Sequence, residues 1–433
     1  MDPIALAGLG LAFMFLLIIL HVPIAAAMAL TGFVFFGIMN GFQSAVSLFG
    51  TETAAALSYA DLAVIPLFLL MGGFAGASGL SADLFRLANA LVGHWRGGLA
   101  MATIGGSAGF GAVCGSSIAT AATMARVALP EMLQRKYEPG LATGSIAAGG
   151  TLGILIPPST MMVLYCFLTE QSLLTLFMAA VIPGLIAVAF HFIAIAIVVR
   201  SNPAAGPGGE RASWRERFVV MGRSWGVVLL IFIVTGGIYG GVFTVTEAAA
   251  IGAACTFMFT LLRGRMTFAV LRQVLQETAT TTAMIYMLLI GASILTYFIT
   301  VTRLPDFVVD GIEAMDLSPI LVILILLVIY IVLGAIFDTV AAMVLTLPFV
   351  FPLVIGMGYD PIWWGVVNVM VIEIGMITPP IGINVFVLHS VTKNIPLGTI
   401  YRGITPFLMA DIARLLLIVF VPALALWLPS MLG

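Results

Sequence analysis

The chain of 433 residues is 62% hydrophobic and 8% charged, with a formal net charge of −2. Soluble domains average about 45–50% apolar and about 25% charged residues, so this composition excludes an ordinary soluble protein. Apolar runs near the ~20 residues that cross a bilayer recur from end to end, which predicts an all-α protein that spans the lipid bilayer many times. The three cysteines lie in apolar stretches without metal-ligand spacing and predict no disulfide framework.

The hydropathy pattern predicts ten crossings in two sets of five. The first five are predicted near residues 4–20, 24–40, 61–79, 140–166 and 173–198. Between the third and the fourth lies a Gly-rich stretch, 97–130, which we expect to form a re-entrant hairpin. Residues 199–224, rich in Pro, Gly and Arg, are predicted to be a linker. The second five crossings, with a second hairpin at 318–352, are predicted near residues 225–241, 245–262, 280–300, 362–390 and 404–428.

Two motifs recur when the chain is displaced against itself by 222 residues. Tyr137-Glu138-Pro139 falls on Tyr359-Asp360-Pro361, and Pro157-Pro158 falls on Pro379-Pro380. Both subtractions, 359 − 137 and 379 − 157, give 222. Because proline pairs are rare in strongly apolar stretches, the shared spacing predicts two diverged copies of one unit.

An odd number of crossings in each copy predicts that the copies, residues 1–198 and 225–433, are inverted repeats joined by a cytoplasmic linker. The positive-inside rule supports this topology and predicts that both termini lie outside the cytoplasm. Threading the chain places 14 of its 17 basic residues on one side: Arg86, Arg96, Arg135, Lys136, Arg200, Arg211, Arg215, Arg217, Arg223, Arg263, Arg265, Arg272, Lys393 and Arg402. The basic linker is interpreted as a topology determinant, so no nucleic-acid partner is expected.

Both proline pairs interrupt an apolar crossing, and this predicts broken helices at 140–166 and 362–390. Proline lacks an amide hydrogen and clashes with the preceding turn. A break at membrane depth frees carbonyl groups, so it is tolerated only inside protein or beside a watery cavity. Freed carbonyls with nearby hydroxyls suit a small alkali cation, and the helix N-terminus beyond each break suits an anion. A helix merely kinked by proline is the structural alternative.

The tip of the first predicted hairpin carries Gly115-Ser116-Ser117, and at offset 222 the two serines correspond to Asp338 and Thr339. Both copies therefore place polar residues beside a broken helix. A carboxylate in an apolar segment costs roughly 2.5–3.5 kcal/mol, so Asp338 is a functional candidate. A phosphate-binding loop at Gly106 to Gly111 is excluded because no strand precedes it and no Gly-Lys-Ser/Thr follows.

Other charged or titratable residues in apolar segments have structural alternatives. Glu247 is expected either to cap the following helix or to act in function. Glu373 is expected to be a functional carboxylate or a structural hydrogen-bond partner. His191, and Asp411 beside Arg414, are interpreted as structural.

These features resemble the large membrane subunit (M subunit, DctM-like) of the TRAP (tripartite ATP-independent periplasmic) transporters. The matching residues are the Gly-Ser-Ser tip with Ala119-Thr120, the two Gly-x-x-x-Pro-Pro segments and the run Thr246-Glu247-Ala248-Ala249-Ala250. The resemblance covers essentially the whole chain. It implies a sodium-driven elevator transporter of the bacterial inner membrane, not an enzyme, in which hairpins and broken helices move against a scaffold. It also implies two protein partners, a periplasmic substrate-binding protein and a separate small four-helix membrane subunit.

Two sodium sites and one substrate site are predicted, with no organic cofactor. The first sodium site, at the first hairpin tip and break, is predicted to use Ser116, Ser117, Thr120, Gly153, Ile156 and Pro158. The second, at the matching place in the second copy, is predicted to use Asp338, Thr339, Gly375, Thr378 and Pro380. The substrate is expected between them, near Ser159, Thr160, Gly382 and Asn384.

The resemblance favours an organic acid anion as substrate: a C4-dicarboxylate, a sialic acid, or another sugar or keto acid. A self-sufficient sodium–dicarboxylate symporter of related elevator architecture would share the hairpins and breaks but work without a binding protein. An intramembrane protease would need Gly-x-Ser-x-Gly with a histidine, or paired Asp motifs, and Asp338 lacks the Gly-x-Gly-Asp setting. A purely structural subunit would have no reason to keep two polar breaks.

Overall fold

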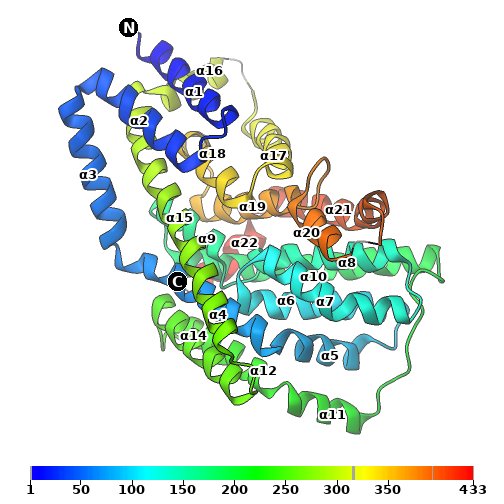
Figure 1. Cartoon of the computed structure of the whole chain (residues 1–433). Helices are drawn as coiled ribbons and strands as arrows, with labels where there is room; N and C mark the ends of the chain where they lie inside the picture. Colours follow the sequence, from blue (N-terminus) through cyan, green and yellow to red (C-terminus); the bar gives the residue numbers. More distant parts are fainter. Residues whose placement is uncertain (1, 315–316, 393, 433) are drawn as a thin grey trace.

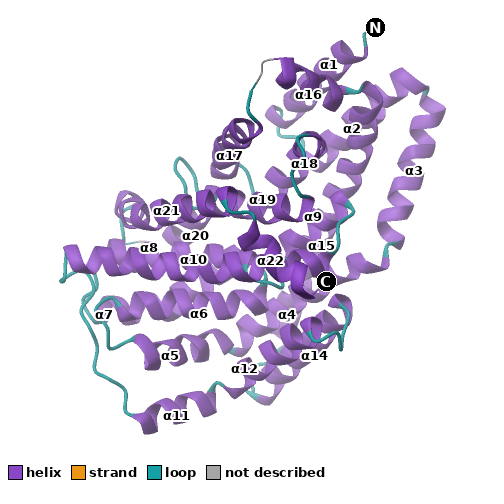
Figure 2. Ribbon diagram, turned by 180° about the vertical axis from the view of Figure 1, so that it is seen from behind, coloured by secondary structure: helices purple, strands orange, loops and turns teal. Residues whose placement is uncertain are grey.

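A computed structural model describes residues 2–314, 317–392 and 394–432, and within these ranges every regular element is helical (Figure 2). Lys393, one of the basic residues used for the predicted topology, lies outside the described residues. By length and composition, seven described helices can cross a membrane, or nine if each of two bent helix pairs counts as one span. The predicted all-α, polytopic fold class is therefore confirmed.

The first half of the chain runs from short apolar helices to a long final helix (Figure 1). Its helices α6 and α7 form the first hairpin, and α8 and α9 form the first broken helix. The elements are α1 (Pro3–Ile19), α2 (Ile24–Asn40), α3 (Phe42–Ser58), η1 (Ala60–Ala63), α4 (Val64–Ser78), α5 (Leu80–Val92), α6 (Gly98–Cys114), α7 (Ser117–Gln134), α8 (Pro139–Leu155), α9 (Thr160–Thr169) and α10 (Leu173–Ser201).

The second half contains the second hairpin, α17 and α18, and the second broken helix, α19 and α20. Helix α11 (Trp214–Arg223) lies in the linker. The elements of the second half are α12 (Trp225–Ile231), a π-helical turn η2 (Phe232–Gly236), α13 (Gly237–Tyr239), α14 (Val245–Leu262), α15 (Phe268–Thr302), α16 (Leu304–Ala314), α17 (Pro319–Ile336), α18 (Thr339–Gly356), α19 (Pro361–Gly375), α20 (Ile383–Val391), α21 (Leu397–Phe420) and α22 (Ala423–Leu432).

Several helix starts keep the spacing found in the sequence. Helices α7 and α18 begin 339 − 117 = 222 residues apart, and α8 and α19 begin 361 − 139 = 222 residues apart. Pro139 and Pro361 both stand at the first helical position, where the missing amide hydrogen costs no intrahelical bond. Asp360 then accepts hydrogen bonds from the amides of Ile362 and Trp363 and caps α19.

Some predicted boundaries were wrong. The crossing expected at 404–428 is two helices, because α21 ends at Phe420 and α22 begins after Pro422, which has no amide hydrogen. The crossing expected at 280–300 lies in the C-terminal part of the 35-residue helix α15. Helices α3, α5, α11 and α16 were not predicted, and in both overall views α3 stands at the outer edge of the molecule (Figures 1 and 2).

Glu247 caps α14, which confirms one of its two expected roles. Its carboxylate accepts the Thr244 amide hydrogen at 2.8 Å, and the Thr244 hydroxyl accepts the Glu247 amide hydrogen at 3.2 Å. These reciprocal bonds form a capping box.

Glycines let the broken helices pack backbone to backbone against their neighbours. A Cβ atom at Gly403 of α21 would collide with the carbonyl oxygen of Gly140 in α8. In the first hairpin, a Cβ atom at Gly111 would lie 2.6 Å from the Cα atom of Gly153. Such close approach is how membrane helices gain packing energy without a hydrophobic driving force between them.

Candidate functional site at the two helix breaks

The first break is buried and tied to the first hairpin by side-chain hydroxyls. Helix α8 ends at Leu155, α9 begins at Thr160, and the two axes differ by 40°. The Ser159 hydroxyl donates to the Ile154 carbonyl at 2.5 Å. The Thr160 hydroxyl donates to the Gly115 carbonyl of the hairpin at 3.1 Å. Two carbonyls near the break and the hairpin tip thus gain hydrogen-bond partners inside the protein, as membrane depth requires.

The first hairpin tip brings three predicted sodium ligands together. Gly115 has φ of +62°, which favours glycine, and lets the chain turn from α6 into α7. The Ser116 carbonyl accepts the Thr120 hydroxyl at 2.7 Å. A Cβ atom at Gly153 would lie 2.8 Å from the Ser116 carbonyl oxygen and 2.7 Å from the Thr120 hydroxyl oxygen. The tip therefore rests directly on the glycine end of α8.

The remaining predicted ligands of the first site lie along the break. The Pro158 carbonyl oxygen would be 3.2 Å from a Cβ atom at Gly115, so it borders the tip. Ile156 is half-buried, and its side chain lies against Gly184 of α10. Ser117 is 2% exposed, and its partner comes from the other half of the chain.

Asn384 of α20 joins the two halves at this point. Its side-chain amide donates to the Ser117 hydroxyl at 2.6 Å and, more weakly, to the Ala147 carbonyl at 3.5 Å. Asn384 is fully buried, and its amide oxygen accepts no hydrogen bond from the described residues. The residue expected at the substrate site thus contacts the first predicted sodium site.

The second break is longer and rests on α17. It spans residues 376–382, against 156–159 in the first copy. Gly375 packs so closely on Gly334 that a Cβ atom there would lie 3.0 Å from the Ala335 amide nitrogen. The Gly382 amide donates to the Ala335 carbonyl at 3.2 Å. These contacts lie near the C-terminal end of α17, just before the hairpin tip.

The second predicted sodium site is less closely assembled than the first. Asp338 caps α18 by accepting the Val340 amide hydrogen at 3.1 Å. The Thr378 hydroxyl donates to the Ile374 carbonyl, and the Pro380 carbonyl accepts the Tyr401 hydroxyl at 2.8 Å. Among the described residues, no hydrogen bond joins Asp338 or Thr339 to the second break.

The two breaks also differ in exposure. Residues 157–160 of the first break are buried, whereas Pro379, Pro380 and Ile381 of the second are exposed. Ser159 and Asn384 are fully buried and Thr160 is 8% exposed, so the predicted substrate residues face protein. The second break is therefore the more open part of the candidate site.

A cluster of buried charges lies near the end of α19 that leads into the second break. The sequence did not predict that its members meet. Arg414 of α21 donates to Asp411 at 2.7 Å and pairs with Glu373 of α19. His191 of α10 lies 2.7 Å from the same Asp411 oxygen. All four side chains are fully buried. Glu373 lies two residues before Gly375, so the cluster anchors the end of α19 that carries the break.

Each member of this cluster is visible in the sequence as a polar residue in an apolar helix. His191 and Asp411 are 220 residues apart and Glu373 and Arg414 are 41 apart, so no local pattern indicates that they meet. The structural role expected for His191, Asp411 and Arg414 agrees with this geometry.

A helical membrane protein with two interrupted helices, each packed on a hairpin, has the architecture of a membrane transporter. The chain belongs to the DctM component family of the tripartite ATP-independent periplasmic (TRAP) transporters, whose family model matches residues 11–424. It is 36% identical over 391 residues to the C4-dicarboxylate TRAP transporter large permease protein DctM of Pseudomonas aeruginosa, covering 90% of each chain. The predicted recognition is confirmed, and the relatives are permeases rather than enzymes.

Two further relatives carry other substrate names. The chain is 30% identical over 375 residues to the sialic acid TRAP transporter large permease protein SiaM of Vibrio cholerae, covering 86% of each chain. It is 31% identical over 408 residues to the 2,3-diketo-L-gulonate TRAP transporter large permease protein YiaN of Escherichia coli, covering 94% of this chain and 95% of that one.

A solved structure shares the fold. The YdaH transporter of Alcanivorax borkumensis, whose crystal structure is described as having an unusual topology, superposes with a TM-score of 0.60. The match covers 91% of this chain and 90% of the other at 15% sequence identity. At that identity the likeness concerns the fold alone.

The buried cluster generates a stability prediction. Arg414→Leu leaves Glu373 and Asp411 buried without their common cation, and breaking such a pair typically costs about 3–5 kcal/mol. We expect a large fall in the thermal unfolding midpoint of the purified protein in detergent. Adding Glu373→Gln and Asp411→Asn to Arg414→Leu should restore much of the lost unfolding midpoint, because these changes remove the uncompensated charges.

Arg303→Leu is the matched control, since Arg303 pairs with Asp306 on an exposed surface. It should change the midpoint little. An Arg414→Leu protein as stable as the wild type would show that the cluster does not anchor α19.

Proposed function

We propose that this chain is the large permease of a sodium-coupled secondary transporter that takes up an organic acid anion across the inner membrane. A periplasmic binding protein delivers the substrate, and a small four-helix membrane subunit completes the complex. Membership in the TRAP family supports both partners and the secondary mode of transport. The observation that carries the sodium and substrate chemistry is the contact of the first hairpin tip with the first break and with Asn384.

Organic anions are the common chemistry of the relatives' names. Those names specify C4-dicarboxylate, sialic acid and 2,3-diketo-L-gulonate, all carboxylates, and isethionate, a sulfonate, at 30–36% identity. Because these identities are similar, sequence likeness does not single out one substrate. A carboxylate is the proposed class for this chain, with the specificity residing mainly in the binding protein.

The first sodium ion is proposed to bind between the hairpin tip and the break. The hydroxyls of Ser116, Ser117 and Thr120 and the carbonyls of Gly153, Ile156 and Pro158 are hard oxygen donors, which suit an alkali cation. The tip already rests on Gly153, and the Asn384 amide oxygen accepts no hydrogen bond from the described residues. Asn384 is therefore proposed as an additional ligand of the first sodium ion, whereas the sequence predicted it only for the substrate site.

The Ser117–Asn384 hydrogen bond offers a physical basis for coupling. Sodium at the first site would bind the same hairpin tip that Asn384 contacts. Sodium binding would therefore favour one position of α20. The N-terminus of α9, beside Ser159 and Thr160, is proposed to present its first amides and a partial positive charge to an anion. The N-terminus of α20, beside Gly382, adds a second partial positive charge, although the Gly382, Asn384 and Val385 amides already donate to carbonyls. The anion and the sodium ion thereby stabilise each other's binding, which is the reciprocity that linkage requires.

The second sodium site is proposed to form when the second hairpin closes on its break. Its donors are Asp338, Thr339, Gly375, Thr378 and Pro380, and the hairpin end already contacts Gly375 and Gly382. On closure, the Pro380 carbonyl would release the Tyr401 hydroxyl and bind the cation instead. The exposure of Pro379 and Pro380 in this structure supports an open second site.

Transport is proposed to follow an elevator mechanism. The inverted copies, with both termini outside the cytoplasm, would bring both breaks near the bilayer midplane. The hairpins and broken helices would carry the loaded site against the remaining helices. A crosslink that freezes these two parts should stop uptake without abolishing substrate binding, and uptake at the normal rate would rule the movement out.

Reconstitution tests the function as a whole. Proteoliposomes with this chain, its small subunit and its binding protein should accumulate a carboxylate substrate only under an inward sodium gradient. Omitting the binding protein should stop uptake. Uptake that persists without it would instead favour a self-sufficient sodium–dicarboxylate symporter, and uptake unaffected by replacing sodium with potassium would overturn the sodium coupling.

Ser117→Ala tests the first sodium site. It removes a hydroxyl ligand and the acceptor of the Asn384 bond, so the sodium concentration for half-maximal uptake should rise several-fold with the complex still assembled. Ser107→Ala is the matched control, because Ser107 is equally buried in α6 but lies away from the tip. An unchanged sodium activation curve for both Ser117→Ala and Ser116→Ala would contradict the assignment.

Asp338→Asn tests the second site. Asparagine caps a helix about as well as aspartate, so α18 should keep its start while the charge is lost. Uptake should be abolished or strongly slowed in protein that inserts normally. Asp360→Asn makes the same change at the cap of α19 and should leave uptake near normal. Normal uptake by Asp338→Asn would mean that its carboxylate serves only as a cap.

A further inference from the structure

Helix α11, in the linker between the two halves, has features that the transport mechanism does not use. It begins with a capping box, in which Ser213 donates its amide hydrogen to Glu216 at 2.7 Å and accepts the Glu216 amide hydrogen at 3.2 Å. The helix packs against α5 and continues after Ser224 into α12. Its axis is bent by 61° from the following segment, so the two do not cross the membrane as one rod.

One face of α11 carries an exposed apolar stripe. Trp214, Phe218 and Met221 follow one another at intervals of four and three residues, which places them on one side of α11, and Trp225 starts α12 just beyond the bend. Their exposed fractions are 70%, 67%, 47% and 56%. The exposed apolar surface continues along the next segment to Phe232, 73% exposed, in a stretch apolar enough to contact lipid. The stripe is thus followed along the chain by a second exposed apolar surface.

Arginines accompany the stripe. Residues 210–223 contain four arginines and two glutamates, a balance of +4 − 2 = +2. Glu216 is engaged in the cap, and the hydrogen bond from the Ser213 backbone amide lowers its pKa. The Arg217 guanidinium stacks 5.0 Å from the Trp214 ring centroid. Arg215 and Arg223 are exposed and form no ion pair with the described residues, so their charges are available to another molecule.

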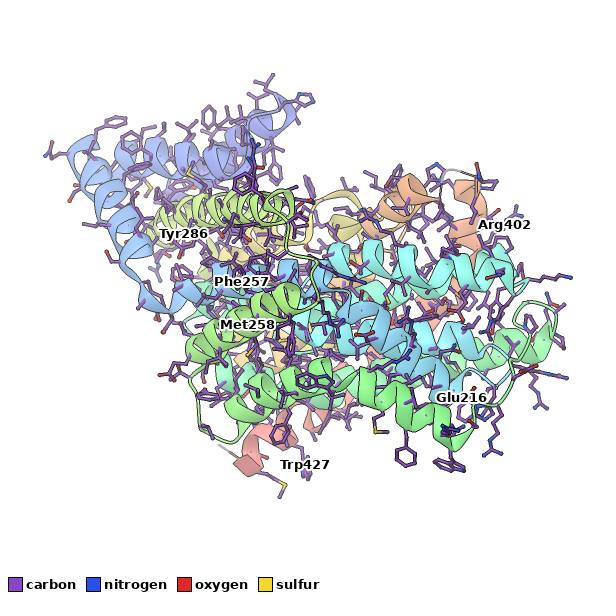
Figure 3. All side chains as sticks on the ribbon, turned by 60° about the horizontal axis from the view of Figure 1, so that its bottom comes forward. Glu216, Phe257, Met258, Tyr286, Arg402 and Trp427 are labelled. Atoms are coloured by element: carbon purple, nitrogen blue, oxygen red, sulfur yellow. The ribbon has the colours of Figure 1, made fainter. Side chains whose placement is uncertain are left out.

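We propose that α11 lies in the cytoplasmic membrane–water interface and binds anionic phospholipid head groups. The inference rests on the proposed topology for the side of the membrane, but the contact itself does not require uptake. An interfacial helix buries its apolar face at the acyl boundary and places basic side chains at the phosphates. The side-chain view shows α11 along the edge of the molecule, with Glu216 at its outer end (Figure 3).

The charge pattern favours lipid over a protein partner. A protein interface would bury both the apolar stripe and the flanking arginines. A bilayer separates them by depth, and the bend between α11 and α12 allows α11 to lie in a different direction from the following apolar segment. Each arginine near an anionic surface contributes roughly fivefold to binding, equivalent to about 1 kcal/mol.

Fluorescence quenching by brominated lipids tests the proposal on the whole protein. The chain is reconstituted in phosphatidylcholine with a small fraction of phosphatidylglycerol, and bromine is carried by one lipid or the other. The Trp214 signal is obtained by subtracting the quenching of Trp214→Phe protein. We expect brominated phosphatidylglycerol to quench Trp214 more strongly than its fraction of the total lipid predicts. Arg215→Gln with Arg223→Gln should lower this preference several-fold, as should high salt.

The matched control is Arg200→Gln with Arg272→Gln, which removes the same charge from exposed positions outside α11. It should leave the Trp214 preference unchanged. Equal quenching by both lipids, or a preference that survives the loss of Arg215 and Arg223, would overturn the proposal. Quenching by neither lipid would also overturn it and indicate that water or a protein subunit covers the helix. None of these outcomes depends on transport activity, so the proposed function is tested separately.

Discussion

Backbone groups at a broken helix inside a membrane must find hydrogen-bond partners in the protein, and the centre of this molecule is built around that requirement. At the first break, the hydroxyls of Ser159 and Thr160 donate to the Ile154 and Gly115 carbonyls. Meeting the requirement brings the hairpin tip onto Gly153. The proposed first sodium site lies at this contact between the hairpin tip and the end of α8.

The two breaks meet the same requirement differently. The first break is short, buried and closed by its hairpin, while the second is longer and exposed at Pro379 and Pro380. Tyr401 supplies the hydrogen bond at Pro380. In the proposed mechanism, the closed first break holds the cargo and the exposed second break opens and closes. Asn384 connects them by contacting Ser117 across the two halves of the chain.

Buried charge has a separate role in this structure. Glu373, Asp411, Arg414 and His191 form one cluster across α10, α19 and α21. Four such groups are costly in a membrane interior unless they satisfy one another. Their mutual pairing holds the helix that ends at the second break without drawing any of them into the predicted ion sites.

The membrane class, the two helix breaks, the hairpin tips and the 222-residue spacing can be predicted from the amino-acid sequence, because each depends on local composition or on proline geometry. The same residues also indicate the family. The folded structure is needed to show that Asn384 contacts Ser117, that Arg414 joins Glu373 to Asp411, and that the second break is exposed. These contacts join residues up to 267 positions apart, and no local propensity records which distant helix a buried side chain will face. The extra helices α3, α5, α11 and α16 likewise depend on packing, which overrides hydropathy at helix ends.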